Sequence, residues 1–205
     1  MTLSGAGGDQ AGRTVLITGA AKGLGAAVTR RCLRDGYTPV LLDRDLETLK
    51  SFAHELSCEY HHLDITDIEQ IPAVVDAVAR SHGSLYGLVN NAGINRPAPG
   101  ATMPAHAWNS VIEVNLNGTF FMSQAVYPHL QEQSSIVNLG SILSARGTFG
   151  RAAYTATKAA ITALTKVLAV EWAGRGIRVN AVARRGLRHP LCRTSINWAG
   201  STSRL

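Results

Sequence analysis

Short apolar runs alternate with amphipathic segments along most of this chain, and this alternation constrains the fold more than any other feature. The first run, Thr14-Val-Leu-Ile-Thr18, is β-branched and aliphatic, as in a buried parallel strand. Residues 23–34 follow it with Leu24, Val28 and Cys32 on one side of a helix. We expect strands at 14–18, 39–43, 59–63, 85–90, 135–139 and 177–183, and helices at 23–34, 45–56, 67–81, 107–130 and 151–173. Strands joined through helices form a parallel sheet with helices on both faces. The sequence therefore predicts a three-layer α/β protein with a doubly wound parallel sheet.

Length and composition limit the domain organisation and the compartment. The chain has 205 residues, no internal repeat and no linker, so we expect residues 1–183 to form one domain. No apolar run approaches the ~18 residues of a membrane-spanning helix, and residues 1–12 lack the pattern of a signal peptide. The three cysteines have no paired spacing, which predicts neither disulfides nor a metal site and favours a cytoplasmic location.

A glycine-rich turn lies between the first expected strand and the first expected helix. It reads Thr18-Gly19-Ala20-Ala21-Lys22-Gly23-Leu24-Gly25. Glycines in this context let a phosphate approach the backbone, and the start of the helix offers free N–H groups and the positive end of its dipole. The spacing is Gly-x-x-x-Gly-x-Gly and not Gly-x-Gly-x-x-Gly. The turn therefore predicts a dinucleotide site.

A second motif, Tyr154-Thr-Ala-Thr-Lys158, lies far downstream on the helix expected at 151–173. Residues four apart share one face of a helix, so an ammonium group would lie beside a phenol and lower its pKa. A phenol tuned in this way is a proton donor and acceptor for a carbonyl/alcohol pair. With 5 tyrosines and 4 lysines in the chain, a chance pair at this spacing has an expectation of about 0.1. The motif carries weight because it accompanies the glycine turn, and the two together predict hydride-transfer chemistry.

With these two motifs and several others in the same order, residues 13–183 resemble the short-chain dehydrogenase/reductase family. The additional matches are Asp64-Ile65, Asn90-Asn91-Ala92-Gly93, Asn115 in Val-Asn-Leu-Asn-Gly, Ser141 thirteen residues before Tyr154, and residues 177–183. The resemblance implies a Rossmann-like fold, here with six strands and the usual seventh missing. It also implies an NAD(P)-dependent oxidoreductase that interconverts a secondary alcohol and a ketone.

The resemblance further implies specific roles for residues. Tyr154 would exchange a proton with the substrate oxygen, Lys158 would lower the pKa of the tyrosine and hold the nicotinamide ribose, and Ser141 would donate a hydrogen bond to the substrate oxygen. Asn115 would order a water that links Lys158 to solvent. The expected cofactor-binding residues are Thr18, Gly19, Lys22, Gly23, Leu24, Gly25, Asp43, Arg44, Asp64, Ile65, Asn91, Ala92, Gly93, Tyr154 and Lys158.

Asp43 bears on the choice between NAD and NADP. A carboxylate at the end of the second strand accepts hydrogen bonds from a ribose 2′-OH and repels a 2′-phosphate, which favours NAD. Lys22 and Arg44 are cations at positions that can hold a 2′-phosphate in relatives, so NADP stays the alternative. We expect NAD.

The final 22 residues depart from the family pattern. Residues 184–205 carry five arginines and no acid, whereas the rest of the chain has 15 basic and 14 acidic groups. The family's Pro-Gly, its threonine and its seventh strand are not found there, so we expect an atypical basic tail that arose from a shifted reading frame, an aberrant splice or a damaged gene end. A genuine divergent C-terminus is the alternative.

The partners follow from the same considerations. We expect a small alcohol or ketone substrate, and a homodimer through the helices at 107–130 and 151–173, as the resemblance implies. Apart from Trp198, the basic tail lacks interleaved aromatic residues, and it has no recognition motif, so we expect neither nucleic acid nor membrane as a partner. A cofactor-binding protein with little or no turnover is the alternative function.

Overall fold

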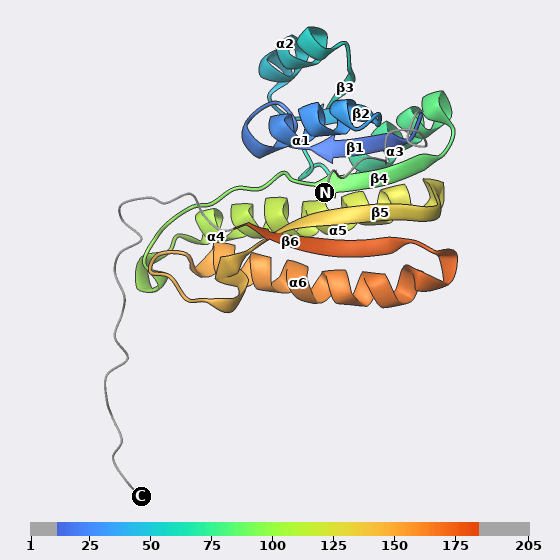
Figure 1. Ribbon diagram of the computed structural model, residues 1–205. Helices are drawn as coiled ribbons and strands as arrows, with labels where there is room; N and C mark the ends of the chain where they lie inside the picture. The colour runs from blue at the N-terminus through green and yellow to red at the C-terminus, as the bar shows by residue number, and fades with distance from the viewer. Residues whose placement is uncertain (1–11, 185–205) are drawn as a thin grey trace, which may run out of the picture.

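The computed structural model describes residues 12–184, which form a single parallel sheet covered by helices on its two faces (Figure 1). The strands are β1 (Thr14–Thr18), β2 (Thr38–Asp43), β3 (Glu59–His62), β4 (Leu85–Asn90), β5 (Leu130–Ser141) and β6 (Arg178–Arg184). The helices are α1 (Gly23–Arg34), α2 (Leu46–Leu56), α3 (Gln70–His82), α4 (Ala105–Ile112), α5 (Thr119–Val126) and α6 (Ala152–Trp172). The predicted α/β fold is confirmed.

The order of the strands determines where a ligand can enter. The sheet runs β3-β2-β1-β4-β5-β6, and every strand pairs parallel to its neighbours. The chain moves outward from β1 to β3 and then returns to the other side of β1 at β4. A crevice opens at such a reversal, above the carboxyl ends of the strands. We therefore expect a ligand site at the boundary between β1 and β4.

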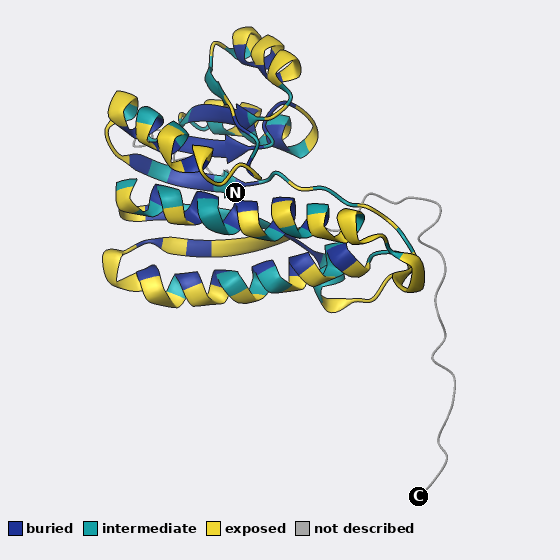
Figure 2. Ribbon diagram, turned by 180° about the vertical axis from the view of Figure 1, so that it is seen from behind, coloured by how far each residue is buried: buried dark blue, intermediate teal, exposed yellow. Residues whose placement is uncertain are grey.

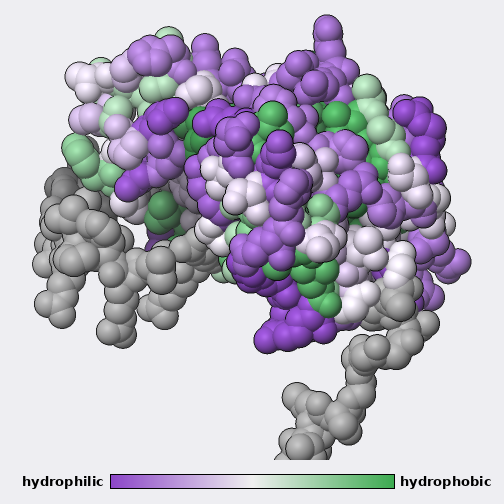
Figure 3. Space-filling view, turned by 90° about the horizontal axis from the view of Figure 1, so that it is seen from above, coloured by the Kyte–Doolittle hydropathy of each residue, from purple (hydrophilic) through white to green (hydrophobic). Residues whose placement is uncertain are grey.

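Two hydrophobic clusters hold the layers together. One packs Ile17 and Leu41 of the sheet against Leu49 and Phe52 of α2. The other lies on the opposite face, between the sheet and helices α3, α5 and α6. Seen from that side, these helices present buried residues inward and exposed residues outward (Figure 2). Seen from above, the surface of the molecule is mostly hydrophilic, with small separate hydrophobic areas (Figure 3).

The helix expected at 107–130 differs from the prediction. It is divided into α4, a π-helical turn at Glu113–Gly118, α5 and a short 3-10 turn at Tyr127–His129. The chain leaves the helix at Leu130, so β5 begins five residues before the expected Ser135. Gly118 explains the close packing of the π turn, because a methyl group there would lie 2.7 Å from the Ile65 side chain.

The remaining boundaries agree within a few residues, and α3 begins at Gln70 where residue 67 was expected. No helix within residues 12–184 has both the length and the hydropathy needed to span a bilayer. The expected tail lies outside the described residues, except for Arg184 at the end of β6.

Candidate active site

A pocket of about 1110 Å³ lies over the carboxyl ends of the strands, where the crevice was expected. One end is lined by the glycine turn and by the end of β2, and the other by the end of β5 and the start of α6. Segments more than 100 residues apart in the sequence therefore share one cavity.

The glycine turn is tied to the end of β4 by a compact set of hydrogen bonds. The hydroxyl oxygen of Thr18 accepts from the backbone N–H groups of Asn91 and Ala92, each at 3.1 Å. The side-chain amide of Asn91 donates back to the carbonyl oxygens of Thr18 and Gly19. Gly25 packs so closely that a methyl group there would lie 2.1 Å from the Gly19 carbonyl oxygen. These contacts hold the glycine turn against the end of β4 and form the floor of the crevice.

The start of α1 meets the requirements of a phosphate-binding turn. Gly23 has a φ of +60°, and a methyl group there would contact nothing within 4 Å, so the backbone faces open space. Lys22 precedes the helix and makes no side-chain cap, which leaves the N–H groups of the first turn uncapped by a side chain. Because Gly19, Lys22 and Leu24 line the pocket, this end fits a dinucleotide pyrophosphate.

Asp43 lies at the end of β2 and is directed toward the glycine turn. One carboxylate oxygen accepts from the backbone N–H of Ala21 at 2.9 Å, and the other accepts from that of Asp45 at 3.0 Å. A carboxylate has about four acceptor positions, so it can still accept a ribose hydroxyl. Asp43 therefore both positions the turn and lines the pocket.

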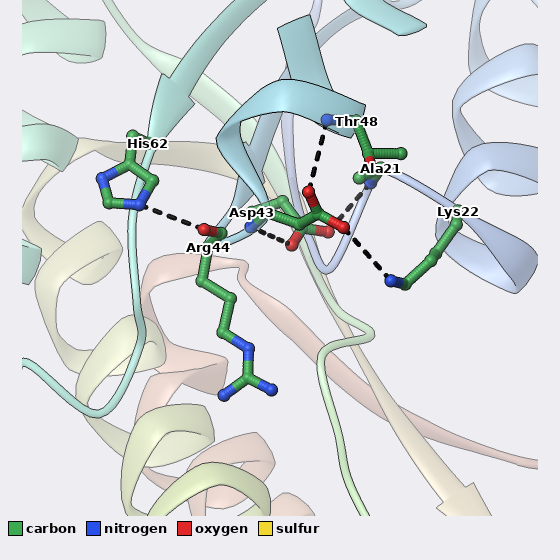
Figure 4. Close-up of polar contacts among 7 residues, drawn as sticks. Ala21, Lys22, Asp43, Arg44, Thr48 and His62 are labelled. Carbon is green, nitrogen blue, oxygen red and sulfur yellow. Dashed lines mark hydrogen bonds and ion pairs between the residues drawn. The ribbon is translucent and has the colours of Figure 1, made fainter. Parts of the chain in front are cut away.

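Each of the two cations at this end lies near an acid. Lys22 Nζ is 3.2 Å from Asp45 Oδ2, and Arg44 Nη1 is 3.9 Å from Asp64 Oδ2. Figure 4 shows the Lys22 side chain turned toward the acids at the end of β2, whereas the Arg44 side chain extends away from them. Asp64 is further engaged by the backbone N–H and hydroxyl of Thr66.

At the other end of the pocket, Ser141, Tyr154 and Lys158 line the same wall. Ser141 is the last residue of β5, and its hydroxyl oxygen accepts from the backbone N–H of Leu143 at 3.1 Å, which leaves its proton available. The Lys158 ammonium lies 5.7 Å from the centre of the Tyr154 ring and donates to the Leu139 carbonyl at 2.5 Å. The Tyr154 hydroxyl has no hydrogen-bond partner among residues 12–184.

Lys158 is buried, with 6% of its surface exposed. Burial disfavours the charged form and lowers the pKa of Lys158 from its usual 10.5 to about 8. The ammonium can thus lose its proton near pH 8, well below the pH at which an exposed lysine does so.

Asn115 is fully buried in the π turn and acts on the loop after β4. Its Oδ1 accepts from the Ile94 N–H at 2.8 Å, and its Nδ2 donates to the Ile94 carbonyl at 2.9 Å and to the Thr157 hydroxyl at 3.2 Å. Both amide protons are therefore committed, and one acceptor position remains on Oδ1. A methyl group at Gly93 would lie 3.3 Å from this oxygen and 3.8 Å from Lys158 Nζ, so both atoms border the same space.

Most residues named from the sequence come together in this pocket. Those that line it are Gly19, Lys22, Leu24, Asp43, Arg44, Asp64, Ile65, Asn91, Ala92, Gly93, Ser141, Tyr154 and Lys158. Thr18, Gly23, Gly25 and Asn115 do not line it and lie behind or beside it. Thr18, Gly25 and Asn115 contact lining residues as described above.

Sequence reasoning missed several lining residues. Asp45, Asn95, Arg146, Thr148 and Arg151 belong to loops or to the first residue before a helix. Asp45 carried a detectable signal, because it directly precedes a helix and caps it: its Oδ1 accepts from the Thr48 N–H at 3.3 Å. Asn95, Arg146 and Thr148 lie in segments without periodicity, and Arg151 precedes α6 without capping it, so these residues offer no such signal.

Comparison with known proteins adds an independent observation. A family model described as short chain dehydrogenase matches residues 13–197. This match continues beyond residue 183, where the resemblance was expected to end.

Individual relatives agree with the family model. A 3-oxoacyl-(acyl-carrier-protein) reductase of Thermotoga maritima is 40% identical over 187 residues, which covers 88% of this chain and 76% of the relative. D-threitol dehydrogenase of Mycolicibacterium smegmatis is 36% identical over 179 residues, covering 84% and 69%. The crystal structure of a short-chain dehydrogenase/reductase from Brucella melitensis, a glucose/ribitol dehydrogenase by its description, has a TM-score of 0.82 at 34% identity and covers 85% of this chain and 76% of its own.

Proposed function

This chain belongs to the short-chain dehydrogenase family, and from that membership we propose that it interconverts a secondary alcohol and a ketone with Tyr154 as general acid and base. Its relatives are dehydrogenases and reductases, and the chain is accordingly an NAD(P)-dependent oxidoreductase acting on CH–OH groups. The observation that carries the finer proposal is the shared pocket. Ser141, Tyr154 and Lys158 line one end, and the glycine turn with Asp43 lines the other.

The catalytic end supplies a proton donor and a hydrogen-bond donor for one oxygen atom. A bound nicotinamide supplies or accepts hydride. The Tyr154 hydroxyl is free of partners within the described residues, so it can give its proton to a carbonyl oxygen or take one from an alcohol. Ser141 keeps its hydroxyl proton available because its oxygen is the acceptor for Leu143. The two hydroxyl groups would thus converge on the oxygen at which charge develops.

Lys158 and Asn115 assist the proton transfer by Tyr154 without contacting the substrate oxygen. Lys158 lies beside the Tyr154 ring, and its lowered pKa suits an ammonium that returns a proton to the tyrosine. Asn115 clamps Ile94 and keeps one acceptor position beside Lys158, where it would hold a water. We assign Asn115 a positioning role, because its amide group contacts the backbone of the loop.

For the cofactor we propose NAD. The Asp43 carboxylate lines the pocket at the end of β2, keeps acceptor capacity for a ribose hydroxyl and would repel a 2′-phosphate. Asp64 and Ile65, together with Asn91, Ala92 and Gly93, line the space where the adenosine would lie. Ion pairing of Lys22 and Arg44 with neighbouring acids agrees with this choice.

We also propose a homodimer through α4, α5 and α6. The side of α6 opposite the core carries Val167 and Val170, which are 51% and 79% exposed. Trp108 on α4 is 38% exposed. Apolar side chains at such exposure favour burial against a second copy.

The function is tested by assaying a panel of secondary alcohols with NAD and of ketones with NADH, and the same panel with NADP and NADPH. We expect turnover with NAD(H) to exceed turnover with NADP(H). Tyr154→Phe should lower kcat by about 10²–10⁴-fold and leave the NADH Kd within about twofold, because it removes only the hydroxyl group that exchanges the proton and keeps the ring. Tyr86→Phe, on β4 outside the pocket, is the control and should behave as the parent does.

Three outcomes would contradict parts of this proposal. Comparable use of NADP would remove the role given to Asp43. Full activity of Tyr154→Phe would remove the role given to the tyrosine. NADH binding without turnover on the whole panel would favour the alternative of a cofactor-binding protein.

A further inference from the structure

The end of the pocket beside β2 contains more charge than a ribose hydroxyl requires. Three acids and two cations line it: Asp43, Asp45, Asp64, Lys22 and Arg44. The acids therefore exceed the cations by one. The pairing of these acids with Lys22 and Arg44 decides whether a cation is available to a phosphate group that binds at this end.

Asp45 contacts three residues, Thr48, Lys22 and Asp43. Its Oδ1 accepts from the Thr48 N–H and caps α2, its Oδ2 lies 3.2 Å from Lys22 Nζ, and its backbone N–H donates to Asp43. Thr48 and then Lys22 lower the pKa of Asp45, so it is ionised at neutral pH. Figure 4 shows Lys22 extending from the glycine turn toward the carboxylates at the end of β2, where its Nζ is paired with Asp45.

We propose that Asp45 adds to the cofactor specificity given by Asp43 by holding Lys22 in an ion pair, which withdraws this cation from a 2′-phosphate. The inference rests on the proposed function, because it presumes a dinucleotide in this pocket. Lys22 belongs to the glycine turn itself, and its side chain is 74% exposed, so it can move once it is released from Asp45.

Asp43 does not explain the direction in which the Lys22 side chain points. Each of its two oxygens accepts one backbone N–H, from Ala21 and from Asp45, and no contact joins it to Lys22 in the described structure. Arg44 extends away from Lys22 and lies near Asp64. Asp45 is therefore the acid that directs Lys22.

The test is a fluorescence titration of the protein with NADH and with NADPH at low ionic strength, without substrate. Asp45→Asn removes the charge and retains a side-chain oxygen that can cap α2. If that oxygen stays on Thr48, the amide group faces Lys22 and cannot accept from it. We expect the NADPH Kd to fall about two- to fivefold, in the range of an exposed ion pair, and the NADH Kd to stay within about twofold.

Further variants separate the ion pair from other effects. Asp45→Ser also caps the helix without a charge and should shift the NADPH Kd in the same direction. Asp45→Glu keeps the charge and should retain the parental preference. Adding Lys22→Ala to Asp45→Asn should reverse the gain. Glu55→Gln is the matched control: it removes an exposed 2.9 Å ion pair with Arg30 between the same two helices, outside the pocket, and should change neither Kd.

The outcomes distinguish the inference from the function on which it rests. If the parent binds NADH and both uncharged variants leave the NADPH/NADH ratio unchanged, the inference is wrong and the proposed function stands. If the gain persists after Lys22→Ala, Asp45 acts by simple repulsion and the inference is wrong. If the parent binds neither dinucleotide, both the function and the inference fail.

Discussion

At the scale of single residues, the site depends on groups whose hydrogen-bonding capacity is only partly used. The Ser141 hydroxyl oxygen accepts a hydrogen bond, so its proton is still available to a ligand. The Tyr154 hydroxyl has no hydrogen-bond partner among the described residues, so it can both donate and accept. Asn115 is almost saturated, with one acceptor position left on Oδ1. The capacity that remains on each group determines what it can do to a ligand.

The lowered pKa of Lys158 predicts how the free energy of unfolding of the cofactor-free protein changes with pH. Its pKa is 10.5 when exposed and about 8 when folded, so below pH 8 it is charged in both states and burial penalises the folded one. Between these values the folded state releases a proton that the unfolded state keeps, and the free energy of unfolding should rise with pH, by up to about 3 kcal/mol. Denaturant titrations between pH 7.5 and 10.5 measure this increase.

The matching variants lie on the same helix. Lys158→Met should lose most of the pH dependence over that window and be more stable near pH 7. Lys166→Met, an exposed lysine of α6, should retain the parental dependence. A parent and a Lys158→Met variant with the same pH dependence would contradict the lowered pKa.

At the scale of elements, the β1–α1 turn and the π turn between α4 and α5 place most of the site. In both, glycine permits a close backbone approach: Gly25 to the Gly19 carbonyl and Gly118 to Ile65. A π turn widens a helix by one residue per turn and is frequent at functional sites. Here it carries Asn115, which connects α6 to the loop after β4.

Substitution of Gly23 and of Gly25, at the start of α1, distinguishes the effect of close packing from the effect of backbone conformation. Gly25→Ala would place a methyl group 2.1 Å from the Gly19 carbonyl oxygen, so we expect a loss of about 2 kcal/mol or more and of NADH binding. Gly23→Ala meets open space and only imposes the left-handed φ of +60°, which costs about 1–2 kcal/mol. Thermal unfolding and NADH titration measure both. Equal effects of the two variants would show that the close approach at Gly25 does not matter.

At the scale of the whole molecule, the helices on one face of the sheet have their outer sides exposed, and α6 presents Val167 and Val170 there. Its inner side packs Ile161, Leu168 and Trp172. A helix that is apolar on both sides is expected where a second surface covers it. This is the basis of the proposed dimer.

A single charge tests the dimer. Val170→Asp should shift the molecular mass in light scattering from dimer toward monomer, because it would bury an unpaired carboxylate in the interface. Ala73→Asp adds the same charge at an exposed position of α3 and should leave the mass unchanged. A monomeric parent, or a Val170→Asp variant that stays dimeric, would contradict this interface.

The sequence by itself determined the features that depend on near neighbours. Apolar runs and helical periodicity indicated six strands and the helices between them, the glycine turn indicated the start of α1, and the i,i+4 spacing placed Tyr154 beside Lys158. These patterns express local geometry, in which a few consecutive residues define a face or a turn. The interruption of the helix at 113–118 was missed, because the residues that it contacts, Ile65 and Ile94, lie 21 or more positions away in the sequence.

Only the tertiary structure decided how the polar groups pair. It directs Asp43 to Ala21, Lys22 to Asp45, and Thr18 to Asn91, across 22, 23 and 73 positions of the sequence. These pairs exist because β1 lies between β2 and β4, so the carboxyl ends of three strands meet at one edge. Sequence spacing cannot specify which of several nearby acids a lysine will select, since the choice depends on the direction in which each carboxylate is held.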